Sequence, residues 1–179
     1  MQTGLFSQQQ SSAACAEFED LVERYYRPLY QFAYSLAFSE ADAWDLTQQT
    51  FYTWSVKGEQ LRDPTKAKSW LFTTLHRTFL QSKRRETRFP HHQLEQADSE
   101  LPLTLPKAPD RLDSARALTA LSSMDDKFRA PISLYYLEDC SYDEIAGILN
   151  VPLGTVKSRI SRGIVQLQKL LAHDERMAA

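Results

Sequence analysis

Residues 141–171 read SYDEIAGILNVPLGTVKSRISRGIVQLQKLL, and this stretch decides how the C-terminal part of the chain folds. Ser141 followed three residues later by Glu144 is a capping box, which predicts a first helix that begins at Tyr142. Residues 150–152, Asn-Val-Pro, interrupt that helix, and a longer basic helix follows. A short helix, a three-residue turn and a basic helix are the outline of a helix-turn-helix motif that reads DNA.

The second helix of this motif has two predicted faces. Its apolar stripe recurs at spacings of four and five and consists of Val151, Val156, Ile160 and Ile164. The opposite face is polar and basic in the half where a recognition helix contacts base edges and phosphates; these candidate DNA-binding residues are Thr155, Lys157, Ser158, Arg159 and Arg162. A helical hairpin with a solvated basic face is the alternative, but capping, turn and charge placement together favour the DNA reader.

Composition limits what the remaining residues can add. The chain has 179 residues, of which 42% are hydrophobic and 25% charged, enough for one large or two small domains. Its start lacks the features of a signal peptide and no later run approaches eighteen apolar residues, so we expect a cytoplasmic protein without membrane insertion. The two cysteines, Cys15 and Cys140, and the few histidines have no metal-ligand spacing, so we expect neither a disulfide nor a bound metal.

Charge is distributed in bands along the chain. Residues 17–56 carry two basic and seven acidic side chains, whereas residues 57–88 carry nine basic and three acidic ones. Residues 89–126 are acidic again, with three basic and seven acidic side chains, and residues 127–179 carry seven and six. A protein that only coated DNA would be basic throughout, so the bands indicate a nucleic-acid surface together with acidic surfaces for another partner.

The basic band contains a predicted helix. Asp63 is a good N-cap and Pro64 suits the first helical position, so we expect a helix from there to about Arg88. Polar and basic residues recur in it mostly at intervals of three or four, which suits a nucleic-acid surface; they are Lys66, Arg77, Gln81, Arg84 and Arg88. A solvated helix face explains the same spacing equally well.

Two more helices are predicted upstream. The first covers residues 18–38, with Pro28 as a local kink. Ser39 and Asp42 mark the start of the second, over residues 41–56, which we expect to turn inward Trp44, Phe51, Val56 and part of Leu46. Its other face would present Asp42, Asp45, Gln48 and Gln49 to solvent or to a partner, although acids in a first turn are also favoured by the helix dipole.

Residues 89–109, FPHHQLEQADSELPLTLPKAP, contain four prolines, no glycine and no helical period, which is typical of an extended, semi-rigid linker. The predicted fold is therefore all-α, with two small helical domains joined by this linker. The expected division is a tail over residues 1–15, a domain over 16–88, the linker over 89–113, a helix-turn-helix domain over 114–172 and a tail over 173–179.

These motifs resemble, in order, those of bacterial RNA polymerase sigma factors of the extracytoplasmic-function (ECF) type. Residues 42–54, DAWDLTQQTFYTW, resemble the family's polymerase-binding segment, and residues 69–85, SWLFTTLHRTFLQSKRR, resemble the helix that engages the -10 promoter element. Residues 141–168 resemble the domain that reads the -35 element. The resemblance covers about residues 18–171 and implies a promoter-specificity subunit with no catalytic site and no cofactor.

The resemblance also implies roles and partners. Core RNA polymerase, through the clamp of its largest subunit and its flap, would be bound by Asp42, Asp45, Leu46, Gln48, Gln49 and Phe51. The -10 element would be contacted by Arg62, Lys66, Arg77, Gln81, Arg84 and Arg85, and the -35 element by the recognition-helix residues named above. Promoter DNA is thus the second partner, and an anti-sigma factor a possible third.

The chain departs from the family pattern in two places. Gln49 stands where a Glu is usual, which removes one charge from the polymerase-binding segment. His76-Arg77 and Gln81 replace an Arg-Asn pair and an Asp, which leaves the preferred -10 sequence open. Two other functions remain as alternatives: a stand-alone helix-turn-helix regulator, and a nuclease that uses Asp42 and Asp45, which would lack a partnering His or Lys and a glycine-rich loop.

Overall fold

The computed structural model describes the backbone of residues 3–61, 63–88 and 119–177, and the side chains of residues 17–58, 60–61, 63–88 and 119–172. Within these ranges the chain is helical and contains no strand. The fold class predicted from the sequence is thereby confirmed. The predicted linker over 89–113 and the candidate residue Arg62 lie outside the described residues.

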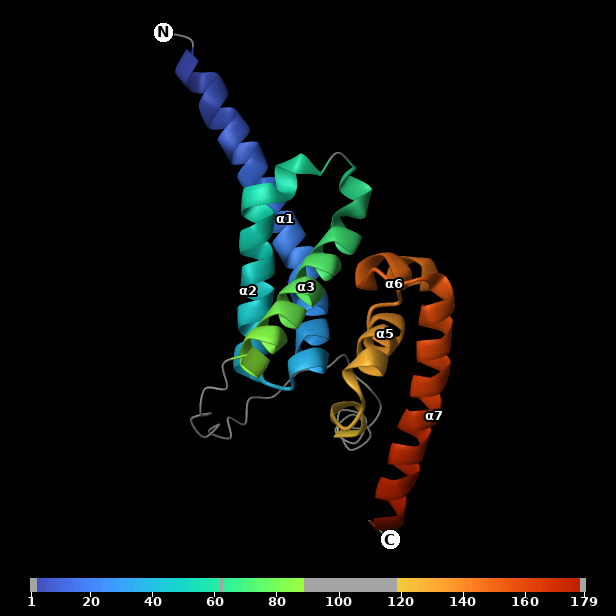
Figure 1. Cartoon of the computed structure of the whole chain (residues 1–179). Helices are drawn as coiled ribbons and strands as arrows, with labels where there is room; N and C mark the ends of the chain where they lie inside the picture. Colours follow the sequence, from blue (N-terminus) through green and yellow to red (C-terminus); the bar gives the residue numbers. More distant parts are fainter. Residues whose placement is uncertain (1–2, 62, 89–118, 178–179) are drawn as a thin grey trace.

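The N-terminal domain is built from three long helices: α1 (Thr3–Ala37), α2 (Glu40–Lys57) and α3 (Ala67–Arg88). Two short 3-10 turns, η1 (Gly58–Gln60) and η2 (Pro64–Lys66), connect α2 to α3. All three helices contact one another around a core of large apolar side chains, among them Leu29, Phe32, Leu71, Phe72 and Leu75. α1 begins at Thr3, so residues expected as a tail continue this helix, and it extends well beyond the bundle (Figure 1).

Helix α2 buries a face that agrees only in part with the expected one, since Phe51 and Leu46 point inward as predicted. Ser39 caps it as predicted, its side chain accepting a hydrogen bond from the backbone of Asp42. The inward residues are Ala43, Leu46, Thr47, Thr50 and Phe51, a spacing of three, four, seven and eight along one helical stripe. The expectation that Trp44 and Val56 point inward was wrong, since they are 48% and 60% exposed. The two threonines replace them in the core because their hydroxyls donate hydrogen bonds to backbone carbonyls one turn earlier.

The C-terminal domain contains α5 (Asp126–Tyr136), α6 (Tyr142–Leu149) and α7 (Leu153–Met177), preceded by a helical turn at residues 119–122. The capping box at Ser141 and Glu144 is present, and α6 begins at Tyr142 as predicted. Asn150 ends α6 in the left-handed region, at φ 53°, a conformation that Asn tolerates better than most residues. The helix-turn-helix outline derived from the sequence is thus the observed local structure.

The two domains pack directly against each other. Helices α5 and α6 lie against α1 and α3, and α7 lies on the outer side of α5 and α6 (Figure 1). A single core cluster continues from Leu75 and Phe79 of α3 into Leu134, Ile145 and Ile148 of the second domain. In the described part of the chain, no helix has the length and apolar character needed to span a membrane.

Candidate functional site

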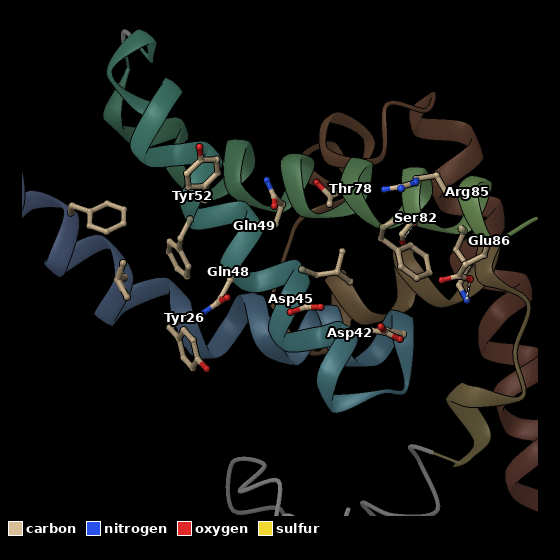
Figure 2. A pocket seen from close by; sticks show the side chains of 17 residues that line it. Tyr26, Asp42, Asp45, Gln48, Gln49, Tyr52, Thr78, Ser82, Arg85 and Glu86 are labelled. Atoms are coloured by element: carbon tan, nitrogen blue, oxygen red, sulfur yellow. Dashed lines mark hydrogen bonds and ion pairs between the residues drawn. The ribbon is translucent and has the colours of Figure 1, made fainter. Parts of the chain in front are cut away.

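A groove of about 880 Å³ lies on the N-terminal domain between α1, α2 and the end of α3 (Figure 2). Its lining combines apolar side chains in the centre with polar and charged ones at the edges. The lining residues that matter below are Phe18, Tyr26, Asp42, Asp45, Leu46, Gln48, Gln49, Phe51, Arg85 and Glu86. An apolar centre with a polar edge is the usual construction of a protein-binding surface.

Phe51 lies at the centre of the groove. Its ring meets Phe18 edge to face at 6.4 Å and stacks with Tyr26 at 6.5 Å between ring centroids. Leu46 is buried beside it, and only 6% of its surface is exposed. Of the candidate polymerase-binding residues, Leu46 and Phe51 therefore form the floor and give the groove its shape.

The α2 edge of the groove carries the other four candidates. Asp42, Asp45, Gln48 and Gln49 are all exposed and lie along the edge in sequence order (Figure 2). On the α3 edge stand Arg85 and an exposed ion pair, in which Lys83 Nζ lies 3.3 Å from a Glu86 carboxylate oxygen. The structure thus separates an acidic edge on α2 from a mixed edge on α3.

The exposed face of α3 carries three of the six candidate -10 residues, together with Arg88. Arg77, Gln81, Arg84 and Arg88 are exposed at positions i, i+4, i+7 and i+11, so they share one helical face. Arg85 instead lines the groove. Lys66 stands at the start of the helix with 70% of its side chain exposed, 3.9 Å from the Asp63 carboxylate.

The connection between α2 and α3 is shaped by two local interactions. The Asp63 carboxylate accepts hydrogen bonds from the Thr65 hydroxyl at 2.6 Å and its backbone N–H at 3.1 Å, which lowers the pKa of Asp63. Gly58 lets the chain pass over Trp54, because a Cβ at this position would lie 2.7 Å from the indole ring. The sequence analysis missed Gly58, and its position directly after α2 was the available signal.

The candidate -35 residues all lie in the first half of α7. Lys157, Ser158 and Arg162 are exposed, whereas Thr155 and Arg159 are half-buried. The half-buried Arg159 faces the other domain. Burial, with a smaller contribution from the Arg159 guanidinium, lowers the pKa of His76 on α3 to about 4.

Two residues that the sequence analysis did not single out, half-buried Lys68 and buried Glu138, lie where the domains meet. Lys68 Nζ donates a hydrogen bond to the backbone carbonyl of Glu138 at 2.8 Å, and the Glu138 side chain is buried. The charge pattern alone gave no signal for this pair, because the residues are 70 positions apart. No group of three or more potential metal ligands occurs within the described residues.

Comparison with known families matches both domains. Residues 21–89 match sigma-70 region 2, and residues 114–167 match sigma-70 region 4. The chain is 35% identical to the ECF RNA polymerase sigma factor SigE of Mycolicibacterium smegmatis, over 95% of this chain and 67% of that protein. It is 31% identical to the ECF sigma factor SigL of Mycobacterium tuberculosis, over 90% and 94% of the two chains.

Solved structures with the same arrangement of helices are also known. The sigma factor RpoE of Bartonella quintana, in complex with the anti-sigma factor NepR, aligns with a TM-score of 0.74 and 28% identity over 87% of this chain and 97% of that one. CnrH, in complex with the cytosolic domain of CnrY, aligns with a TM-score of 0.66 and 27% identity over 95% and 97%. The two matched regions and these similarities over nearly the whole chain show that it belongs to the ECF RNA polymerase sigma factors and acts as a sigma factor in transcription initiation.

Proposed function

We propose that the groove between α1, α2 and α3 binds the clamp of core RNA polymerase, that the basic face of α3 engages the -10 element, and that the first half of α7 reads the -35 element. In this assignment residues 16–88 form the domain for the clamp and the -10 element, and residues 114–172 the domain for the flap and the -35 element. The linker over residues 89–113 connects them.

The observation that carries this proposal is the separation of charge onto different elements. The acidic side chains Asp42 and Asp45 are exposed on α2, whereas Arg77, Arg84 and Arg162 are exposed on α3 and α7. Acidic side chains repel the phosphate backbone and attract a basic protein surface, and exposed arginines do the opposite. One chain therefore presents a surface suited to protein and two surfaces suited to DNA.

The proposed chemistry needs no catalytic group. Turning one or two bases out of the duplex costs about a few kcal/mol, which stacking and phosphate contacts to α3 can offset. On α7, a bidentate contact from Arg159 or Arg162 to a base edge would discriminate by about 1–3 kcal/mol. We therefore infer that the chain is a binding subunit without enzymatic activity of its own, and that it works in the cytoplasm, where bacterial transcription takes place.

An anti-sigma factor is a further proposed partner. RpoE and CnrH resemble this chain along nearly its whole length. RpoE was solved in complex with the anti-sigma factor NepR, and CnrH in complex with the cytosolic domain of CnrY. A regulator of this kind would compete for the groove or the basic faces. Co-purification of the chain with proteins encoded in its own cell, followed by competition against core polymerase, tests this.

The first experiment mixes the purified chain with core RNA polymerase and measures binding by co-elution and fluorescence anisotropy, without any promoter. Saturable binding that is weakened in Asp42→Lys/Asp45→Lys supports the proposal. The matched control is Asp143→Lys, which changes an exposed acid at the start of α6. Binding of DNA without any binding of core polymerase would instead indicate a stand-alone helix-turn-helix regulator.

A further inference from the structure

The contact between the two domains contains a polar pair within a largely apolar interface. Lys68, in the first turn of α3, donates its charged hydrogen bond to the carbonyl of Glu138 at 2.8 Å, across 70 residues of chain. Such a bond needs both domains to be in place, because its donor belongs to one and its acceptor to the other. A hydrogen bond from a charged donor contributes more than a neutral one when it is shielded from water.

The Glu138 side chain is itself buried in this contact. Only 7% of its surface is exposed, and its Oε1 atom has no hydrogen-bond partner among the described residues. Burial raises its pKa to about 8; the Lys68 ammonium opposes this rise and Asp139 adds to it. The neighbouring thiol of Cys140 is 2% exposed, and burial raises its pKa too, with Lys68 opposing and Glu144 of α6 adding to the effect.

A second polar contact joins the domains near the other end of their interface. The buried guanidinium of Arg129 on α5 donates a hydrogen bond to the carbonyl of Leu36 at 3.2 Å and lies 4.8 Å from the centroid of the Phe38 ring. The apolar core runs continuously between these two contacts. The packed arrangement is therefore a specific docking of the two domains.

This docking holds the two proposed DNA-reading helices, α3 and α7, too close together to contact the -10 and -35 elements at the same time. By their numbering, the -10 and -35 elements lie about 25 base pairs apart, which is about 85 Å of duplex at 3.4 Å per step. In the docked arrangement Arg159 of α7 is close enough to His76 of α3 to influence its pKa. The 25 residues over 89–113 reach at most about 85 Å when fully extended, so the chain is long enough to open.

We propose that Lys68 and the Glu138–Cys140 loop form an intramolecular lock, which holds the free chain closed and must break before it can contact both promoter elements. This inference depends on the DNA-reading surfaces proposed above. The closed form binds one more proton than the open form at pH 7. Glu138 is protonated at this pH when it is buried, whereas an exposed Glu138 has its ordinary pKa of 4.5 and is ionised. The proton therefore favours closing fully below about pH 4.5, and this contribution decreases as the pH rises, until it is lost above about pH 8.

Cys140 provides a direct test, because its thiol is buried at the lock and reacts only after opening. The test uses the full chain in a Cys15→Ala background, with 5,5′-dithiobis(2-nitrobenzoic acid) as the thiol probe. Each rate is normalised to that of the urea-unfolded chain at the same pH, which removes the effect of pH on the thiolate itself. Small-angle X-ray scattering of the same samples reports the radius of gyration.

Lys68→Met keeps the aliphatic stem and removes the charged donor. We expect the normalised Cys140 rate to rise about tenfold at pH 7, the size expected for losing one charge-assisted hydrogen bond, together with a larger radius of gyration. Lys57→Met is the matched control, since it removes an exposed lysine at the end of α2, and it should leave both quantities unchanged. Equal rates in Lys68→Met and Lys57→Met, or a faster rate without expansion, would overturn the lock.

Glu138→Gln supplies the second variant. It keeps the shape of the side chain and removes its titration, so it should remain closed at pH 9, where the original chain opens. A parallel rise of the normalised rate between pH 7 and pH 9 in both proteins would contradict the proton-linked part of the lock. None of these measurements includes polymerase or DNA, so failure of the lock is distinguishable from failure of the proposed binding surfaces.

Discussion

The groove beside α2 and the basic face of α7 are two proposed binding surfaces that differ in construction. In the groove, aromatic and aliphatic side chains such as Phe51 and Leu46 form a floor, and exposed Asp and Gln side chains stand above it on α2. On α7 the floor is the domain's own core, through Val156 and Ile160, and the exposed side carries Lys157 and Arg162.

The difference follows from what each surface is proposed to contact. A protein partner supplies apolar side chains that can fill a groove, so shape and apolar area contribute much of the affinity. A duplex supplies phosphates and base edges, so the DNA surface needs arginines and lysines on a rigid helix more than it needs a cavity. The groove should therefore be sensitive to loss of volume, and the α7 face to loss of charge.

Removing the floor of the groove should have the largest effect. Phe51→Ala deletes a nearly buried ring that contacts Phe18 and Tyr26, and we expect it to lower the free energy of unfolding by about 3–5 kcal/mol. Urea unfolding followed by circular dichroism measures this. Tyr52→Ala, next along α2 but 66% exposed, is the control and should change stability by no more than about 0.5 kcal/mol. Equal losses in the two variants would mean that Phe51 is not the floor.

Removing charge from the recognition helix should affect DNA binding and spare polymerase binding. Arg159→Ala should lower discrimination between -35 sequences by about 1–3 kcal/mol, because a direct base contact is lost. Competition binding of the polymerase-bound chain to selected and scrambled promoters measures this. Lys169→Ala, an exposed lysine in the second half of α7, is the matched control. A uniform loss on both promoters would reassign Arg159 to a phosphate contact.

Removing the helix cap should weaken the C-terminal domain without touching either binding surface. The Ser141 hydroxyl accepts a hydrogen bond from the Glu144 backbone, and the Glu144 carboxylate accepts one from the Ser141 backbone at 2.8 Å. Ser141→Ala should cost about 1 kcal/mol of stability. Hydrogen exchange of α6 amides localises the change; exchange that increases equally in α2 would show that the two domains unfold as one unit.

Reversing one charge on the edge of the groove should have the smallest effect. Asp45→Lys alters an exposed side chain, so we expect core polymerase binding to weaken by about 1 kcal/mol, with a shallower dependence on salt. Association kinetics at two salt concentrations measure both quantities. Binding of -35 DNA by the same variant should stay unchanged, and a matching loss there would contradict the division into a protein surface and a DNA surface.

Much of the local structure could be predicted because its causes are local. The start of α6, the cap at Ser39 and the turn after Asn150 depend on side chains within three or four residues of the backbone groups that they bond. The grouping of Arg77, Gln81 and Arg84 on one face follows from the helical period alone. For the same reason the candidate residues on α3 and α7 could be named before any tertiary contact was known.

The burial pattern of α2 could not be predicted so well. An apolar count favoured Trp44 and Val56 as inward residues, yet Thr47 and Thr50 lie in the core and the tryptophan is half-exposed. A threonine hydroxyl that donates a hydrogen bond to a carbonyl of its own helix can be buried at little cost in free energy. Hydrophobicity alone therefore does not predict which face of α2 points inward. Likewise, only the position of the Trp54 ring shows why residue 58 is glycine.

By itself the sequence determined the helices, their caps, the helix-turn-helix motif and the alternation of acidic and basic bands, because hydrogen bonds and periodicity act over a few residues. Only the tertiary structure decided that the two domains dock, that Glu138 is buried, and that Arg159 faces α3. Those features depend on contacts such as Lys68 with Glu138 and Arg129 with Leu36, which join residues 70 and 93 positions apart. Contacts at that separation form only when whole helices bury their faces against one another, and no local pattern encodes which faces will meet.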